Sequence, residues 1–442
     1  MYTKKVKRKM KRIINSIFCK NNHKRLFEYE YLYIFAEVTI QKSFMFLIIV
    51  YVLLPFIAAL AASVWIFPKV LQISLKKNIV DNPDARKLQR VPVPVLGGMV
   101  VMFGILVALC VADLFVDCSG MYTIVLAMSI MLFIGTMDDI LDISSITRFV
   151  LEILVALMII YTCDYSLDNL HGLWGVSALS SWVSIPLTIV TVVGIINAIN
   201  LIDGVDGYSS GYCMMACVTF GVFFYLVGDM PMTMLAIVCA AALIPFFLHN
   251  VFGRASKMFI GDGGTLLMGC VMSVFVLNIL KSSTHCEVYC SAGLGLVPFT
   301  LSVLCVPVFD TVRVMTMRIL RKTSPFKADK THLHHLFIEL GFSHIGTTVS
   351  ILTLNSLVVL GWSVSYYCGA SIDCQLYVVI ALSMLVTVGF YYGMRLCGKK
   401  NWLLYRLMQR LGKATHVERK GLFLWLQRAL DGNMSSLVDA NK

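Results

Sequence analysis

Charged residues are scarce in this chain of 442 residues: only 14% are Asp, Glu, Lys or Arg, whereas 58% are hydrophobic. Soluble globular domains carry about 25% charged and 45–50% apolar residues, so polar groups could not cover the surface of a water-soluble particle. The same composition excludes a disordered chain, a collagen-like fibre, a coiled coil and a secreted disulfide scaffold. The sequence has no Cys-x-x-Cys pair, which argues against a zinc-ribbon type of site. The sequence therefore predicts a protein whose solvent is a lipid bilayer.

Long apolar runs are what the chain has in abundance, and a helix of about 17–25 such residues can cross the hydrocarbon core. Eleven runs qualify: 44–67, 95–115, 121–137, 147–163, 181–200, 208–227, 231–249, 264–280, 289–310, 346–366 and 375–394. The first run exceeds the apolar core of a signal peptide, so we expect no cleavable leader. Because only helices or closed barrels satisfy backbone groups in lipid, the predicted fold is all-α, a polytopic integral membrane protein.

Basic residues are distributed unevenly between the loops. Odd-numbered loops and the segment after residue 394 hold 25 Lys and Arg, whereas even-numbered loops hold one, Lys281. Basic residues accumulate on the cytoplasmic side of membranes, so this asymmetry places the odd-numbered loops in the cytoplasm. It also explains the net charge of +12 without nucleic acid.

Three parts follow from this organisation: a basic N-terminal extension (1–43), a transmembrane domain (44–394) and a basic amphipathic tail (395–442). We expect the tail to form one or two amphipathic helices on the inner membrane face. The extension holds 11 basic residues, yet eleven crossings put it outside, against the rule. An incorrect start site, a helix on the membrane surface or one wrong span would resolve this conflict.

The polar motifs all fall in loops that the basic residues assign to the cytoplasm. The first, DDILD, ends the third run with Asp138, Asp139 and Asp142. Asp138 and Asp142 share a helical face, where like charges repel, and a helix C-terminus disfavours anions. The three carboxylates therefore indicate a site for a divalent metal or for phosphate chemistry, with a solvated loop as the alternative.

Two further motifs follow the fifth run and precede the eighth. In NAINLIDGVDG, Asn197, Asn200 and Asp203 recur every three residues along one side of a helix end, and Asp206 follows. The glycines after both Asp permit positive φ and the close backbone approach of a phosphate-binding turn. In GDGG, Asp262 stands at a helix start, which suits Mg²⁺ bound with a diphosphate. A simple helix cap is the alternative for Asp262.

The loop 311–345 is rich in bases. Its candidate ligands for phosphate are Arg321, Lys322, His332, His334 and His335. Successive side chains of HxHH lie on diverging faces of a helix, so contact with phosphate fits better than zinc, and a structural role is the third alternative.

The loop 68–94 carries Arg86, Lys87 and Arg90 before a Pro-x-Pro and the pair Gly97-Gly98. Positive-inside charge explains the basic residues but not the Pro and Gly. Acids, amides and bases thus gather on one side of a membrane protein. Such a site handles a phosphorylated soluble substrate, together with a lipid acceptor that only an intramembrane groove can admit.

Together these motifs resemble those of the polyprenyl-phosphate N-acetylhexosamine-1-phosphate transferase family (glycosyltransferase family 4), on its WecA/TagO side. RKxxxxPxPxxGG, DDxxD, NAxNxxDGxDG, GDxG and HxHH occur in the family's order over about residues 44–394. HLHH is similar to the WecA-type motif, whereas MraY-type sequences tend to carry three consecutive histidines. The chain departs from the frequent pattern at Gln89, Val95 and Lys330, which could shift substrate contacts.

The resemblance implies transfer of N-acetylhexosamine-1-phosphate, most simply GlcNAc-1-phosphate, from a UDP-sugar to undecaprenyl phosphate, with release of UMP. This is the first membrane step of a cell-surface glycan pathway in the bacterial inner membrane, with the active site facing the cytoplasm. The implied partners are UDP-N-acetylhexosamine, undecaprenyl phosphate and membrane lipids. A homodimer is compatible with the family, and no nucleic acid is expected.

The resemblance also implies roles for the motif residues. Mg²⁺, or alternatively Mn²⁺, is expected on Asp262 and Asn200. Catalytic roles fall to Asp138, Asp139, Asp203 and Asp206. Substrate-binding roles fall to Lys87, Asp142, Asn197, Arg321, Lys322, His332, His334 and His335. Asp138 or Asp139 could deprotonate the lipid phosphate, and a covalent aspartyl intermediate is the other route.

Two other functions compete with this interpretation. An MraY-type phospho-MurNAc-pentapeptide transferase would use the same chemistry on a different donor. A secondary transporter would place ionisable residues near the bilayer midplane, whereas here they cluster at the ends of spans. Glu152, inside the fourth run, is the exception, and we expect it to be an interior hydrogen-bonding residue.

Overall fold

The computed structural model describes residues 48–83, 91–282, 293–324, 330–416 and 420–432. Residues Tyr51–Lys442 form one compact unit, and a second unit, Met1–Val50, is described only at its last three residues. The N-terminal extension, Lys87 and Gln89 lie outside the described residues.

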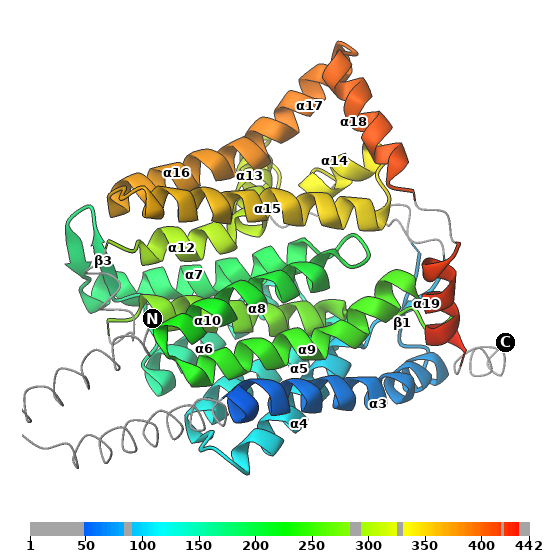
Figure 1. Ribbon diagram of the computed structural model, residues 1–442, viewed down its shortest axis with the longest axis horizontal. Coiled ribbons are helices and arrows are strands. Elements are labelled where there is room, and N and C mark those ends of the chain that lie inside the picture. The colour runs from blue at the N-terminus through cyan, green and yellow to red at the C-terminus, as the bar shows by residue number, and fades with distance from the viewer. Residues whose placement is uncertain (1–47, 84–90, 283–292, 325–329, 417–419, 433–442) are drawn as a thin grey trace, which may run out of the picture. The chain divides into compact units, whose positions relative to one another are not determined.

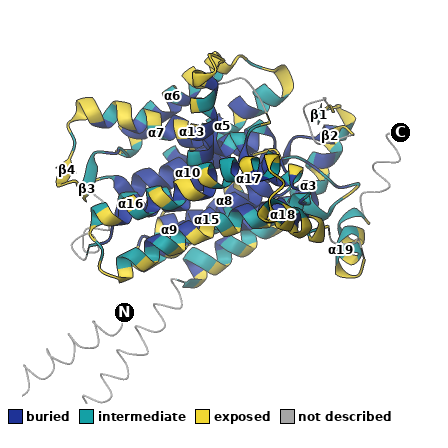
Figure 2. Ribbon diagram, turned by 90° about the horizontal axis from the view of Figure 1, so that it is seen from above, coloured by how far each residue is buried: buried dark blue, intermediate teal, exposed yellow. Residues whose placement is uncertain are grey.

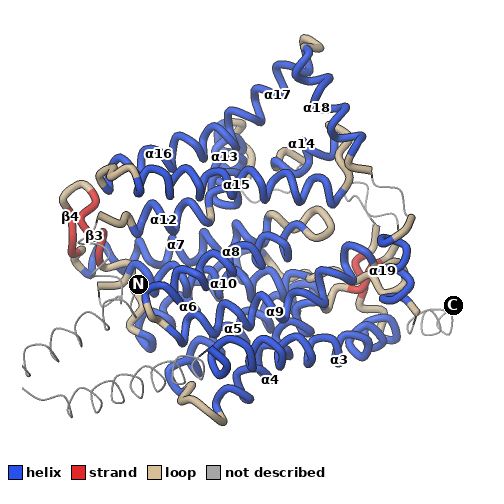
Figure 3. Tube along the Cα trace, in the orientation of Figure 1, coloured by secondary structure: helices blue, strands red, loops and turns tan. Residues whose placement is uncertain are grey.

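The unit from Tyr51 onwards is almost entirely helical (Figures 1 and 3). Its first helix continues a π-helical turn, Ile49–Leu53. The helices are α3 (Leu54–Lys76), α4 (Gly97–Asp113), α5 (Tyr122–Leu141), α6 (Ser145–Cys163), α7 (Ser181–Leu201), α8 (Tyr208–Val227), α9 (Met230–Phe252), α10 (Gly261–Leu280), α12 (Leu296–Val303), α13 (Cys305–Leu320), α14 (Leu333–Glu339), α15 (His344–Tyr367), α16 (Ile372–Met384), α17 (Phe390–Lys399), α18 (Leu403–Ala414) and α19 (Leu422–Asp431). A 3₁₀ turn, Ser119–Met121, precedes α5, and a π-helical turn, Leu385–Gly389, joins α16 to α17.

Most of these helices are long and apolar enough to cross a membrane. Nine of them qualify within the described part of the chain, and α12 with α13, bent by 76°, counts as a tenth if the pair is one span. α4 is shorter, at 17 residues. Each of the eleven apolar runs lies on one of these helices or on the bent pair. The predicted fold class, an all-α polytopic membrane protein, is confirmed.

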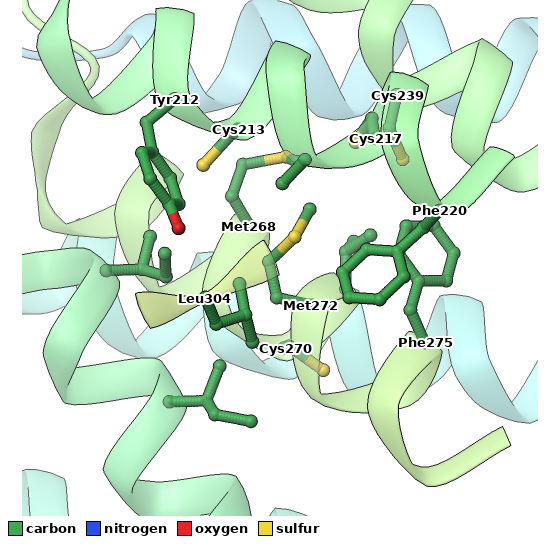
Figure 4. Packing of buried hydrophobic residues seen from close by; sticks show 14 of the residues in the cluster. Tyr212, Cys213, Cys217, Phe220, Cys239, Met268, Cys270, Met272, Phe275 and Leu304 are labelled. Carbon is green, nitrogen blue, oxygen red and sulfur yellow. The ribbon is translucent and has the colours of Figure 1, made fainter. Parts of the chain in front are cut away.

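Helix α10 lies at the centre of the bundle and is buried along its whole apolar window. It packs against α4, α5, α7, α8 and α12. Figure 2 shows the buried residues concentrated on these inner helices, while the outer helices carry the exposed surface. Aromatic and sulfur-containing side chains fill the space between α8 and α10, including Phe220, Phe275 and Met272 (Figure 4). A helix that is apolar all round is stable only in such surroundings, so α10 offers a fixed support to whatever lies at its ends.

Two small antiparallel sheets mark the opposite ends of the bundle (Figure 3). β3 (Asn169–Leu173) and β4 (Val176–Ala178) form a hairpin at one end. β1 (Val80–Asp81) pairs with β2 (Val93–Pro94) at the other, with Val80 opposite Pro94. The amide of Phe259, just before α10, bonds to the Pro94 carbonyl at 2.7 Å, so the second sheet adjoins the N-terminus of α10.

Two glycines let neighbouring helices approach α10 at this end. A Cβ on Gly98 of α4 would collide with the backbone of Gly264, and a Cβ on Gly135 of α5 would collide with the backbone of Asp262 and Gly263. The amide of Gly98 also bonds to the Ile260 carbonyl at 2.8 Å. Close backbone contact therefore explains the Gly-Gly pair that positive-inside charge does not explain.

Candidate active site

Three helix ends meet beside the β1–β2 sheet. α5 ends in the segment that carries Asp138 and Asp139, α7 ends after Asn200, and α10 begins at Gly261, next to Asp262. Consecutive spans alternate in direction, so chain segments separated by more than 100 residues present their acidic motifs at the same end of the bundle (Figure 1). The predicted residues Asp138, Asn200 and Asp262 are thereby brought together.

A single guanidinium joins two of these acids. Arg148, in the first turns of α6, lies 3.0 Å from Asp138 Oδ2 and 3.5 Å from Asp262 Oδ2. Both carboxylates would repel each other without a cation between them. The side chain of Asp262 is 38% exposed, so one of its oxygens remains accessible to a ligand.

Asn200 holds the other oxygen of Asp262. Its Nδ2 donates to Asp262 Oδ1 at 2.8 Å and to Thr265 Oγ1 at 2.9 Å. The Asn200 amide thus fixes the rotamer of Asp262. These contacts place the helix ends of α7 and α10 in one polar cluster.

Asp139 caps α10 from a neighbouring helix. Its Oδ1 accepts the Asp262 amide at 3.0 Å, and its Oδ2 accepts the Gly263 amide at 3.2 Å. The first amides of a helix have no partner within the helix, and a carboxylate there is also favoured by the helix dipole. Both carboxylate oxygens of Asp139 therefore help to position Asp262.

Behind Arg148 lies a fully buried acid, Glu152. Its Oε1 is 3.6 Å from Arg148 Nε, and its Oε2 accepts a 2.5 Å hydrogen bond from Asn197 Nδ2. Asn197 also donates to the Val193 carbonyl at 2.9 Å. The structure thus places Asn197 behind the acidic cluster, where it orients Glu152, and the expected interior hydrogen-bonding role of Glu152 is borne out.

The turn between α7 and α8 holds two more predicted acids. Asp203 accepts a 2.5 Å hydrogen bond from Ser209 Oγ. Crowding by protein atoms, with the charges of Asp262 and Asp206 nearby, raises the pKa of Asp203 although the residue retains exposed surface. This acid therefore accepts a proton more readily than an Asp in water.

Asp206 lies between two bases. Lys257 Nζ is 2.6 Å and His344 Nδ1 is 2.8 Å from Asp206 Oδ2. Burial opposes ionisation, but the hydrogen bond from His344 and the charge of Lys257 outweigh it and lower the pKa of Asp206. Asp206 is thus ionised, and it connects the turn before α8 to the loop before α10 and to the first residue of α15.

The HxHH motif is organised by a buried acid, Asp310, on α13. Asp310 Oδ2 accepts from His332 Nδ1 at 2.9 Å and from the Leu333 amide at 3.1 Å, while Oδ1 accepts from Arg313 Nη2 at 2.7 Å. The opposite nitrogen of His332, Nε2, is buried without a hydrogen-bond partner among the described residues. A buried polar atom without a partner points to a ligand or water at this position.

His334 connects the histidine cluster to the α7–α8 turn. Its Nε2 faces Gly204, where a Cβ would lie 2.5 Å away, and its ring packs on Tyr208. Burial, with His335 and His332 close by, lowers the pKa of His334 well below its usual range. The ring is therefore neutral near pH 7 and can act by hydrogen bonding rather than by charge.

The remaining predicted residues lie at the margin or beyond it. Asp142 is exposed and ends α5 in the left-handed conformation, with φ of 53°. Arg321 and Lys322 are exposed at the C-terminal end of α13. Lys87 falls outside the described residues. Asp142, Arg321 and Lys322 are thus not part of the cluster around Arg148.

The donor atoms of the cluster suit Mg²⁺. Asp138 and Asp262 supply carboxylate oxygens within reach of one cation, Arg148, and the Asn200 side chain is hydrogen-bonded to Asp262. Within the described ranges no group of three or more His, Cys, Asp or Glu side chains is arranged to hold a metal ion. Mg²⁺ usually takes one or two carboxylates, with water and substrate phosphate completing its ligands.

Sequence reasoning did not assign roles to Arg148, Lys257 and His344. Each stands outside the family motifs, and each makes an ion pair with a residue that is distant in the sequence. One signal was present for Arg148: it lies four residues before Glu152, and an acid inside an apolar span requires a partner.

Comparison with known proteins finds similarity over the part of the chain that carries this site. The family model described as "Glycosyl transferase family 4" matches residues 121–280, which contain α5, α7 and the start of α10. The "Undecaprenyl-phosphate alpha-N-acetylglucosaminyl 1-phosphate transferase" of Salmonella typhi is 27% identical over 358 residues, covering 79% of this chain and 91% of that protein.

Two further relatives carry similar names. The protein of the same name from Escherichia coli (strain K12) is 26% identical, over 79% of this chain and 92% of its own length. The "Probable undecaprenyl-phosphate N-acetylglucosaminyl 1-phosphate transferase" of Bacillus subtilis (strain 168) is 28% identical, over 66% of this chain and 79% of its own length. With its five ordered motifs, its helical membrane fold and these relatives, the chain is similar to glycosyl transferase family 4 proteins of the WecA/TagO type.

Proposed function

We propose that this protein transfers N-acetylhexosamine-1-phosphate, most simply GlcNAc-1-phosphate, from a UDP-sugar to undecaprenyl phosphate. The observation that carries the proposal is the meeting of Asp138, Asn200 and Asp262 around Arg148 at one end of a membrane-embedded bundle. The names of the relatives support the acceptor and the sugar.

The bond changes of this transfer define what the site must do. An oxygen of the lipid phosphate attacks the β-phosphorus of the UDP-sugar, and the bond from that phosphorus to the bridging oxygen breaks. UMP leaves with the electron pair, and the lipid becomes a diphosphate linked to the sugar. Because two anions must meet, positioning and charge neutralisation supply most of the rate enhancement.

Arg148 is the residue we assign to this neutralisation. It already contacts two carboxylates, and a phosphate can replace one of them because guanidinium binds both groups in the same planar geometry. Substrate binding would then release Asp138 from its ion pair. A freed Asp138 can take the remaining proton of a lipid phosphate, whose second pKa is about 6.

Asp262 and Asn200 are the residues we assign to Mg²⁺, or alternatively Mn²⁺. When bound, the metal would neutralise charge on the diphosphate and stabilise the leaving UMP. Asp139 fixes the backbone that presents Asp262, so in this proposal it is a positioning residue. The neutral ring of His334 offers a hydrogen bond to the nucleotide or to phosphate, and the unpartnered Nε2 of His332, whose Nδ1 is bonded to Asp310, offers a further polar contact to the substrate.

The site faces the cytoplasm in this proposal. Outside the N-terminal extension, 25 of the 26 Lys and Arg lie in the odd-numbered loops and the tail, which the alternation of spans places at the end of the acidic cluster, as expected for the inner side of a bacterial membrane. UDP-sugars are soluble, so the donor reaches the site from that side, while the acceptor enters from the lipid.

The test is an assay of UMP release by the purified full-length protein. It combines Mg²⁺, undecaprenyl phosphate and a panel of UDP-sugars that includes UDP-GlcNAc and UDP-MurNAc-pentapeptide. We expect release with UDP-GlcNAc or a related UDP-HexNAc only when both lipid and metal are present. Release with UDP-MurNAc-pentapeptide alone would favour the MraY-type alternative, and no release with any donor would contradict the proposal.

A further inference from the structure

Helix α18 turns away from the direction of the membrane-spanning helices. The last candidate span ends at Lys399, and α18 follows after three residues. Figure 1 shows α18 running across the direction of the bundle helices, at the end where the acidic motifs lie. A helix placed directly after a span, and turned across it, lies at the boundary between membrane and water.

One face of α18 already has a protein partner. Tyr405 and Met408 are partly buried against the core, and Gly412, one further turn along, is buried. A Cβ on Gly412 would lie 2.6 Å from the Leu340 carbonyl oxygen, so the helix backbone contacts the loop after α14. These positions fall on one side of the helix, at the spacing expected for a single face.

A second face of α18 is apolar and exposed. Leu403, Leu404, Leu407 and Leu411 retain between 42% and 65% of their surface. They form a separate stripe, because α-helical spacing turns them away from Tyr405, Met408 and Gly412. Beside this stripe, Arg406, Arg410 and Lys413 form an exposed basic row. An apolar stripe bordered by bases is the pattern of helices that lie on anionic lipid.

We propose that this exposed face of α18 binds the surface of an anionic lipid bilayer and thereby holds the loop Gly341–Gly346. The charge of the basic row selects lipid over an apolar protein surface, and the preceding span keeps the helix at the bilayer. The proposal goes beyond the transfer reaction, since it does not depend on which group the site transfers.

Contacts at the C-terminal end of α18 connect the helix to the candidate site. Thr415 Oγ1 accepts from the Ser343 amide at 2.9 Å, and the Thr415 carbonyl accepts from Ser343 Oγ at 2.8 Å. The next residue, His344, is the first of α15, and its Nδ1 lies 2.8 Å from Asp206 Oδ2. A lipid-bound α18 therefore fixes a loop that contributes directly to the acidic turn.

Photo-crosslinking of the full-length protein tests the lipid contact. A benzoylphenylalanine at position 407 faces the proposed lipid, and the same residue at position 408 faces protein, so the two variants differ by one position. The protein is reconstituted in phosphatidylcholine vesicles with or without about a quarter phosphatidylglycerol, since anionic lipid attracts basic segments. We expect lipid adducts at 407, more of them in the anionic vesicles, and protein adducts at 408. Protein adducts at 407, whether from a second copy or another chain, would overturn the proposal.

Hydrogen exchange of the loop 341–346 tests the coupling. We expect slower exchange in anionic than in zwitterionic nanodiscs, and we expect Arg406→Gln with Arg410→Gln to abolish this difference. The same pair should weaken retention of phosphatidylglycerol about tenfold or more, because each basic residue adds to the electrostatic attraction. Lys76→Gln with Lys77→Gln is the matched control, since both lysines are exposed at the end of α3. An equal effect of both pairs, or none of the α18 pair, would refute the inference.

Discussion

At the level of single residues, Arg148 keeps Asp138 and Asp262 close despite their like charge. Arg148→Gln removes that cation, so we expect turnover to fall by at least about 100-fold, as is common when one group that neutralises transition-state charge is lost. UMP release measured at saturating donor and lipid checks this. Asp164→Asn is the control, because this exposed residue ends α6 in a left-handed conformation that Asn also adopts. Wild-type turnover in Arg148→Gln would remove Arg148 from the mechanism.

Glu152 acts only through Arg148 and Asn197, so its loss should be milder. We expect Glu152→Gln to lower turnover by roughly tenfold, as is common for groups that orient a ligand-binding residue. The pH profile distinguishes positioning from catalysis: a positioning role leaves the shape of the profile unchanged. A lost or displaced limb of the profile would instead make Glu152 a proton carrier.

Asp138 and Asp139 are neighbours in the sequence but make different contacts. We therefore expect their Asn variants to differ in turnover and in stability. Asp138→Asn should reduce turnover by about 100-fold with the melting temperature unchanged. Asp139→Asn keeps one of two acceptors for the amides of α10, so we expect it to cost about 1 kcal/mol of stability, a usual value for a helix cap. Thermal unfolding in detergent, run beside the turnover assay, measures both. An Asp139→Asn variant that is inactive yet fully stable would return Asp139 to a catalytic role.

The buried ring of His334 predicts a dependence of stability on pH. Its pKa is lowered in the folded protein, whereas in the unfolded chain it is about 6.5. As the pH falls below about 6.5, the unfolded state binds the extra proton, so the free energy of unfolding decreases. We expect His334→Gln to reduce the loss of melting temperature between about pH 7.5 and 5.5. An unchanged slope would show that the ring takes up a proton as readily in the folded protein as in the unfolded chain.

The motif residues were predictable from sequence because acids and amides at the ends of apolar spans are costly unless they have a use. The partners of Asp206 and Asp262 were not, because Lys257, His344 and Arg148 are ordinary bases until the fold brings them into contact. The sequence also could not distinguish the role of Asp138 from that of Asp139. Only the capping geometry at α10 separates them.

At the level of secondary structure elements, the contact between α5 and α10 sets the spacing of the acids. Gly135→Ala would force its Cβ into the backbone of Asp262 and Gly263, so the helices must separate. We expect loss of stability by about 1–3 kcal/mol, as is usual for overpacking, and a larger proportional loss of UMP release. Gly194→Ala on α7 is the matched control, because a Cβ there meets no atom within 4 Å. Equal behaviour of the two variants would mean that this contact does not position the acids.

The positions of the helices followed from apolar length, but their interruptions did not. The bend between α12 and α13 and the π-helical turn after α16 interrupt runs that are continuous in hydropathy. Local hydrogen bonding decides such breaks: the Asn355 side chain, for example, accepts the Val306 amide at 3.1 Å next to the bend. A pattern of apolar residues carries no information on such a long-range bond.

At the level of the whole molecule, the alternation of spans determines which loops share a side. Loops separated by an even number of crossings lie at the same end, and loops separated by an odd number lie at opposite ends. One crossing, α6, separates Asp142 from Asp164, so these two residues lie at opposite ends. The count of basic residues predicts that the Asp142 end faces the cytoplasm. Both residues are exposed and both end a helix in the left-handed conformation, which makes them a matched pair.

The prediction is that Asp164→Cys reacts with a membrane-impermeant thiol reagent in intact cells, whereas Asp142→Cys reacts only after the membrane is opened. Native cysteines require the unsubstituted protein as the baseline, because Cys110, Cys368 and Cys374 are already exposed. The result expected from the alternation of spans is opposite accessibility of the two positions, whichever side is inside. If Asp142→Cys rather than Asp164→Cys were labelled in intact cells, the proposed cytoplasmic site would be contradicted. A soluble nucleotide sugar in the cytoplasm could then not reach the acids. Equal accessibility would contradict the helical crossing itself, because α6 joins the two positions as one span.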